Sequence, residues 1–269
     1  MMRLKNNYKN RRKKIKKIMK KIMKKITIMR CNKLLIILMI IASLIVLFFC
    51  SSKLYNQFHE LEENNNSNEN LIKDTIEINP VTEEIVGIDW TYLKSVNEDI
   101  VAWIEIEGTN INYPILKDKD VYYLNHSFDK KYNGNGSIFT TNTMPFDDLV
   151  TILYGHNTKL GNMFSNLSNY WNRDFLDAHK KFKIYTPYSN YEATIFSVYS
   201  IGVETESNNI KLLNFNERIN YYKKASKYHI ENNVEINKIV KLSTCSYINA
   251  KSRPTEQRYY IIASLIPIL

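Results

Sequence analysis

Three residues of this chain have side chains that together could carry out acyl transfer: the thiol of Cys245, the imidazole of His156 and the guanidinium of Arg258. A cysteine thiolate attacks carbonyl carbons, an imidazole transfers the proton, and a guanidinium donates hydrogen bonds to the oxyanion that forms. Neighbouring positive charge also lowers the pKa of a thiol and enlarges its reactive fraction. These residue types predict a nucleophilic cysteine that attacks a peptide carbonyl.

Each of the three residues also has a simpler interpretation. Cys245 is the only cysteine after residue 53, in the part of the chain that we expect to be exported. Because exported proteins usually pair their cysteines, a single thiol is either a small buried apolar residue or is kept for its reactivity. His156 competes with the histidines at 59, 126, 179 and 229, and Arg258 competes with Arg253. The residue types alone leave these alternatives open.

The N-terminal segment predicts export. Residues 1–33 contain 15 Lys or Arg and no Asp or Glu, and residues 34–52 are uncharged and mostly aliphatic. The apolar stretch is just long enough to cross a hydrocarbon core of roughly 30 Å, and the basic tail should stay in the cytoplasm. A cleaved signal peptide and a lipid-modified Cys50 are the alternatives. No small-residue cleavage site follows the span, and Phe48 and Phe49 stand where a lipoprotein signal needs small residues, so we expect an uncleaved anchor.

The net charge of +10 arises in this tail. Without its 15 basic residues the chain has 22 Lys or Arg against 27 Asp or Glu, a net charge of −5, which argues against nucleic acid as a partner. No Cys/His cluster has metal-ligand spacing and no glycine-rich loop could hold phosphate, so we expect neither a metal nor a cofactor.

After the span, residues 53–85 lose apolar periodicity and include an Asn- and Glu-rich run at 62–70. This composition cannot bury enough surface to fold alone, so we expect an extracellular stalk or linker. Residues 86–269 have the right length for one compact catalytic domain.

The domain should be mainly β. Short apolar runs separated by turn signals predict strands at 100–106, 111–116, 137–140, 150–154, 182–185, 191–203, 239–245 and 258–265. Helices are expected at 89–97, with Asp89 as the cap, and near 162–170 and 215–228. Since no regular helix separates the strands, we favour a closed or nearly closed β-barrel over a parallel βαβ sheet.

The expected strands bring the three candidate residues to strand ends. Cys245 ends one strand, Arg258 begins the next, and His156 follows a third. We therefore expect them to converge at one rim of the barrel.

Several segments, in their order along the chain, resemble a class B sortase. The segment Leu242-Ser243-Thr244-Cys245 is similar to the family's Thr-Leu-Ser-Thr-Cys signature, with Lys241 in place of the first threonine. Tyr154-Gly155-His156-Asn157 resembles its histidine motif and Arg258-Tyr259-Tyr260-Ile261-Ile262 its arginine strand. Family-like segments also occur at 97–104, 113–115, 136–139, 162–164 and 184–187.

The resemblance implies a closed eight-stranded sortase barrel with N-terminal and inserted helices, after one transmembrane helix. It implies Cys245 as nucleophile, His156 as general acid and base, and Arg258 as the group that stabilises the oxyanion or substrate. Tyr154 and Ser243 would line the substrate groove, to which the segment 204–237 would contribute. Lys241 is expected to point away from the nucleophile and to leave the chemistry intact.

The implied enzyme is a cysteine transpeptidase on the outer face of a Gram-positive membrane. It would cleave an Asn-Pro-x-Thr-like sorting signal on secreted proteins and transfer them to an amine of a peptidoglycan precursor of the lipid II type, or to a pilin. A membrane-tethered cysteine endopeptidase shares the first half of this mechanism. A catalytically idle surface binding module is the third alternative, against which the presence of all three polar residues argues.

Overall fold

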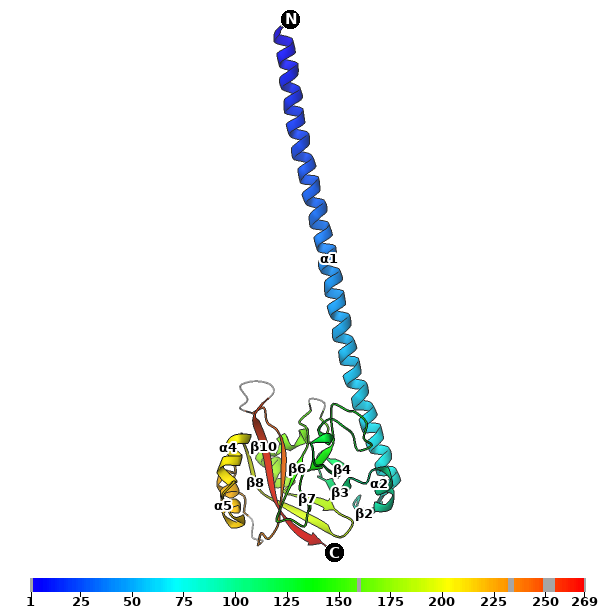
Figure 1. Cartoon of the computed structure of the whole chain (residues 1–269), viewed down its shortest axis with the longest axis vertical. Helices are drawn as coiled ribbons and strands as arrows, with labels where there is room; N and C mark the ends of the chain where they lie inside the picture. Colours follow the sequence, from blue (N-terminus) through cyan, green and yellow to red (C-terminus); the bar gives the residue numbers. More distant parts are fainter. Residues whose placement is uncertain (1, 159–160, 232–234, 249–254, 269) are drawn as a thin grey trace. The chain divides into compact units, whose positions relative to one another are not determined.

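The computed structural model describes residues 2–158, 161–231, 235–248 and 255–268 in two compact units, Met1–His59 and Glu60–Leu269. The first unit is the greater part of one long helix, α1, Met2–Thr75 (Figure 1). It contains the stretch Leu35–Asn56, of mean hydropathy 2.8 and with no buried residue. Among the residues that the structure describes, one helix is long and apolar enough to cross a membrane, and it contains this stretch.

The second unit begins earlier than the domain expected at 86–269. The end of α1 belongs to it: Leu71 is buried, and the side-chain amide of Asn68 donates to the Asn112 carbonyl over 3.0 Å. Strands β1, Ile76–Ile78, and β2, Ile85–Ile88, follow as a two-stranded antiparallel sheet. Residues 60–85 of the expected stalk or linker thus contribute to this unit, because Leu71 and Ile85 pack in one apolar cluster with Trp103 of the barrel.

The fold class is confirmed, since eight strands of the second unit close into a barrel in the order β10-β8-β7-β3-β4-β5-β6-β9 (Figure 1). The barrel strands are β3 Ile100–Glu105, β4 Asn112–Lys117, β5 Ile138–Thr140, β6 Val150–Tyr154, β7 Lys181–Tyr185, β8 Asn190–Gly202, β9 Ile239–Cys245 and β10 Gln257–Ile268. Each expected strand is present, and its observed ends lie within three residues of the expected ones.

Alternation along β9 and β10 separates the barrel interior from the outer face. Val240 and Leu242 of β9 and Tyr259 of β10 belong to the main core, while Tyr260 and Ile262 belong to a second cluster on the other face. Successive side chains of a strand point to opposite faces, so each strand fills the core with every second residue. The intervening residues of β9 are left to form an outer surface.

The helices surround the barrel. Those outside α1 are α2 Trp90–Val96, η1 Tyr122–Leu124, η2 Ser165–Trp171, α3 Arg173–Ala178, α4 Val203–Ile210 and α5 Phe215–Ala225. Asp89 caps α2 as expected, accepting a hydrogen bond of 2.9 Å from the Tyr92 amide. Helices α4 and α5 lie beside β8 in Figure 1.

Two features of the helices differ from what the sequence predicts. The helix expected at 162–170 is the 3-10 helix η2, which starts later because Met163 has a φ of 51°, in the left-handed region that ends regular helix. The strand expected to run to residue 203 ends at Gly202, and the unexpected helix α4 follows it.

Candidate active site

Strand pairing brings the candidate catalytic residues to one end of the barrel. Strand β9 lies between β6, which is parallel to it, and β10, which is antiparallel. Cys245 on β9 is the register partner of Arg258 on β10, and Ser243 is the partner of Tyr154 on β6. His156 lies two residues beyond Tyr154. The convergence expected from the strand ends therefore follows from the register.

The ring of His156 is oriented by a backbone carbonyl. Its Nε2 lies 2.7 Å from the carbonyl oxygen of Leu124, at the end of η1. A carbonyl only accepts hydrogen bonds, so Nε2 carries the proton of this contact and Nδ1 is the nitrogen left for chemistry. The backbone here is close-packed, because a Cβ on Gly155 would come within 2.7 Å of the Phe164 ring.

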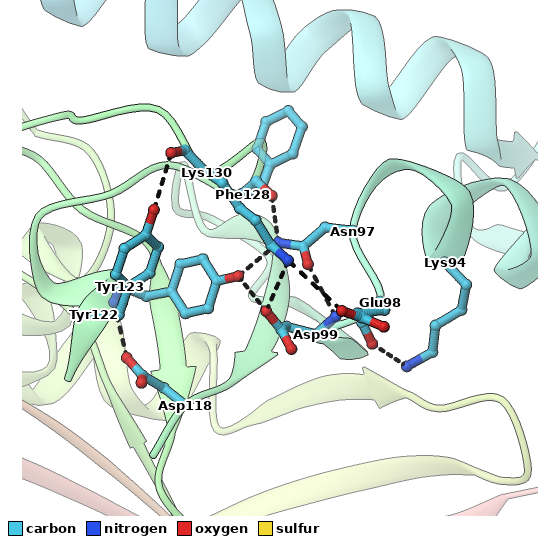
Figure 2. A network of polar contacts seen from close by, with 9 residues as sticks. All are labelled: Lys94, Asn97, Glu98, Asp99, Asp118, Tyr122, Tyr123, Phe128 and Lys130. Carbon is cyan, nitrogen blue, oxygen red and sulfur yellow. Dashed lines mark hydrogen bonds and ion pairs between the residues drawn. The ribbon is translucent and has the colours of Figure 1, made fainter. Parts of the chain in front are cut away.

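A buried polar network holds the segment that supplies this carbonyl (Figure 2). The Asn97 side chain donates to the Tyr123 hydroxyl and to the Phe128 carbonyl, each over 2.7 Å. The Tyr123 hydroxyl donates to Asp99 over 2.7 Å. Burial, helped by the Asp99 carboxylate, raises the pKa of Tyr123, so the hydroxyl remains a donor. The Tyr123 hydroxyl is thus fixed by two partners from the segment 97–99, and Asn97 also ties that segment to Phe128.

The backbone around Tyr123 is fixed as well. Asp118 accepts from the Tyr123 amide over 2.8 Å, and the Tyr123 carbonyl accepts from Ser137 over 2.9 Å. Gly136 has a φ of 60°, and a Cβ there would lie 2.4 Å from the Leu124 oxygen. These contacts hold the Leu124 carbonyl in place, so it is a group that positions His156. The sequence analysis missed it, because a backbone acceptor has no sequence signal.

The Cys245 thiol is half-buried and unpaired. Its strand end is tied to the histidine loop by two hydrogen bonds: Asn157 donates its side-chain amide to the Cys245 carbonyl over 2.8 Å, and Thr244 donates its hydroxyl to the Gly155 carbonyl over 2.7 Å. The two motifs singled out in the sequence therefore hold each other in place.

Arg258 is half-buried, and nearby backbone carbonyls accept hydrogen bonds from its guanidinium. Its Nη1 donates to the carbonyl oxygens of Thr255, over 2.8 Å, and Gln257, over 3.2 Å. These bonds occupy one nitrogen and leave the other donors of the planar group for a ligand. The competing Arg253 lies outside the described residues.

The candidate residues open onto one groove with a volume of about 710 Å³. Residues of strands β6, β9 and β10 and of helix α4 line it. It is lined by Val121, Leu124, Phe139, Thr141, Ile152, Tyr154, Gly155, His156, Val203, Glu206, Ser207, Ile210, Lys211, Arg218, Lys241, Ser243, Thr244, Cys245, Arg258 and Tyr260. Of the five histidines only His156 lines it. Among the described residues, no group of three or more His, Cys, Asp or Glu is placed to hold a metal ion.

Lys241 corrects one expectation about the groove. It lies in the groove rather than pointing away from Cys245, because positions 241, 243 and 245 are two residues apart and share a strand face. Its ammonium pairs with Glu206 of α4 over 2.5 Å, and both side chains are 4% exposed. Burial lowers the pKa of Lys241, and the Glu206 carboxylate opposes this shift.

The sequence of this chain is similar to those of known proteins of one family. A family model described as the sortase domain matches residues 104–266. Sortase B of Listeria monocytogenes is 39% identical over 162 residues, which are 57% of this chain and 65% of that protein. This chain thus spans slightly less than two thirds of the Listeria relative. Sortase B of Staphylococcus aureus is 29% identical over 249 residues, 89% of this chain and 100% of the relative.

Solved structures agree in fold. Clostridium perfringens sortase B matches with a TM-score of 0.60 and 28% identity, covering 66% of this chain and all of that one. The Staphylococcus aureus sortase B–substrate complex matches with a TM-score of 0.59 and 28% identity, covering 67% of this chain and 85% of that one.

Proposed function

Since this chain belongs to the sortase family, in its class B, and sortases are cysteine transpeptidases, we propose that it cleaves a C-terminal sorting signal on secreted proteins and transfers them to an amine. The observation that carries the proposal is the register of β9 and β10. It sets Cys245 opposite Arg258, beside the loop that holds His156, at a groove of about 710 Å³.

The first half of the reaction is acylation. The Cys245 thiolate attacks the carbonyl carbon of the signal's threonine, and the guanidinium of Arg258 donates to the oxygen as it becomes negative. The carbon–nitrogen bond then breaks as the imidazolium of His156 gives its proton to the departing amine. A thioester on Cys245 remains.

The second half returns the enzyme to its starting state. An acceptor amine attacks the thioester, the carbon–sulfur bond breaks, and His156 takes the proton that the amine loses. The products are an amide and the Cys245 thiolate beside an imidazolium. Water in place of the amine would give a free acid, which is the outcome of an endopeptidase.

The proposed substrate is a pentapeptide of the Asn-Pro-x-Thr type. Tyr154 and Ser243 are the proposed contacts for it, since they face each other in register across β6 and β9 and both line the groove. The proposed acceptor is a peptidoglycan precursor of the lipid II type, with a pilin amine as the alternative. The test is to give the purified second unit a panel of quenched pentapeptides with and without acceptor amines and to identify the products. Cleavage without any amide product would favour the endopeptidase.

We also propose that the chain is anchored by the stretch Leu35–Asn56, with its N-terminus in the cytoplasm and the barrel outside. The basic residues of 1–33 support this orientation. In cells stripped of their wall, added protease should digest the barrel and spare the tail, as seen by immunoblot of a chain tagged at each end. A freely secreted barrel, or protection of the barrel until the cells are lysed, would contradict the proposed anchoring.

A further inference from the structure

A buried ion pair lines the groove at some distance from the proposed chemistry. Lys241 of β9 and Glu206 of α4 are 2.5 Å apart, each 4% exposed, and both belong to the groove that contains Cys245. The mechanism uses neither of them. Isolated charges are costly to bury, so a pair kept in a ligand groove calls for an explanation.

The pair is built into its surroundings. Glu206 also accepts hydrogen bonds from the hydroxyls of Tyr199, over 2.5 Å, and Tyr221, over 2.9 Å. The Lys241 ammonium lies 3.9 Å from the centre of the Tyr260 ring. These contacts tie α4 to β8, β9 and α5. The pair therefore holds the wall of the groove in place and also puts two charged groups in that wall.

The pair also lies at a definite distance from the nucleophile. Lys241 is four residues before Cys245 on one strand face, which corresponds to about 13 Å at roughly 3.3 Å per residue. Ser243 lies between them on the same face, and all three line the groove. An extended acyl segment of four residues also spans about 13 Å. A signal held by its threonine on Cys245 and lying along β9 therefore reaches the pair with its first residue.

We propose that Lys241 and Glu206 end the groove at the first residue of the sorting signal and select a polar side chain there. An asparagine amide has both an acceptor for the ammonium and donors for the carboxylate. A leucine would cover both charged groups without offering either a hydrogen bond. This inference rests on the proposed function and deepens it by assigning the residues that read the first position.

The test compares two pentapeptides, Asn-Pro-x-Thr and Leu-Pro-x-Thr each followed by the same fifth residue, which differ only in the first residue. The key variant is Lys241→Met/Glu206→Gln, which removes both charges and keeps an oxygen for the two tyrosine hydroxyls. We expect the preference for asparagine, as a ratio of kcat/KM values, to fall by about tenfold or more, mainly through KM. A purely structural role would lower both rates together and leave this ratio unchanged.

The controls separate selection from folding and from chemistry. Lys238→Met removes a lysine whose ammonium binds the Phe146 carbonyl outside the groove, and it should leave the ratio unchanged. Iodoacetamide should alkylate Cys245 at the wild-type rate in every folded variant. Thermal melting reports on the fold, and if the double variant does not fold, Glu206→Gln alone should shift the ratio in the same direction.

The outcomes are distinguishable. An unchanged ratio in a folded variant, with the wild type active, would overturn this inference and leave the proposed function standing. A wild type that cleaves no pentapeptide of the panel would overturn the proposed function, and this inference with it.

Discussion

Replacing Cys245 by alanine is expected to abolish turnover of sorting peptides while leaving the fold intact. The substitution removes the nucleophile but little volume, and the side chain is half-buried at a strand end rather than packed in the core. Cleavage of quenched peptides should fall to background, and mass spectrometry should no longer find an acyl adduct on the protein.

The matched control is Cys50→Ala, which removes a thiol of α1 at the surface of the first unit. This variant, as the full chain in membranes or detergent, should cleave at the wild-type rate. Circular dichroism and melting temperature should agree for wild type and Cys245→Ala. Wild-type rates in folded Cys245→Ala would reject the catalytic assignment.

Replacing Arg258 by lysine should impair turnover severely even though the positive charge is kept. The guanidinium holds the Thr255 and Gln257 carbonyls with one nitrogen while its other donors remain for an oxyanion, and a single ammonium has no such planar fork. Loss of an oxyanion donor costs about 2.7 to 4 kcal/mol of barrier, a loss in kcat on the order of a hundredfold to a thousandfold.

Arg218→Lys is the matched control, since Arg218 of α5 lines the same groove but donates to the Leu213 carbonyl, which precedes that helix. We expect it to change kcat much less. A loss below roughly threefold in Arg258→Lys would instead assign the oxyanion to Arg253 or to backbone amides.

The barrel could be predicted from the sequence because its strands are short apolar runs separated by turn signals. The run 239–245 shows this: its interior residues are apolar, and its ends coincide with the observed β9. The end of α1 could not be predicted, since the burial of Leu71 depends on contacts with barrel residues distant in sequence. Apart from Ile72 the residues around it are mostly polar, and local composition therefore favoured a linker.

The order of the strand ends predicts that the three catalytic candidates lie at one rim of the barrel. The groups that surround and orient them could not be predicted. The expectation for Lys241 was wrong because an even spacing from Cys245 keeps both on one face. Its partner Glu206 lies on a helix that the sequence pattern did not reveal. The Leu124 carbonyl that orients His156 is a backbone group, and only the fold can show where it lies.

The central claim is transfer to an amine, and the fate of the Cys245 thioester tests it most directly. A transferase must hold the acyl group in a site shielded well enough for a bound amine to react before water does. The purified second unit should therefore turn a sorting peptide over slowly alone. With a glycine-type or diaminopimelate-type amine, mass spectrometry should show amide replacing free acid as the amine concentration rises. Free acid alone across a broad panel of amines, while Cys245 is demonstrably acylated, would contradict the claim and identify an endopeptidase.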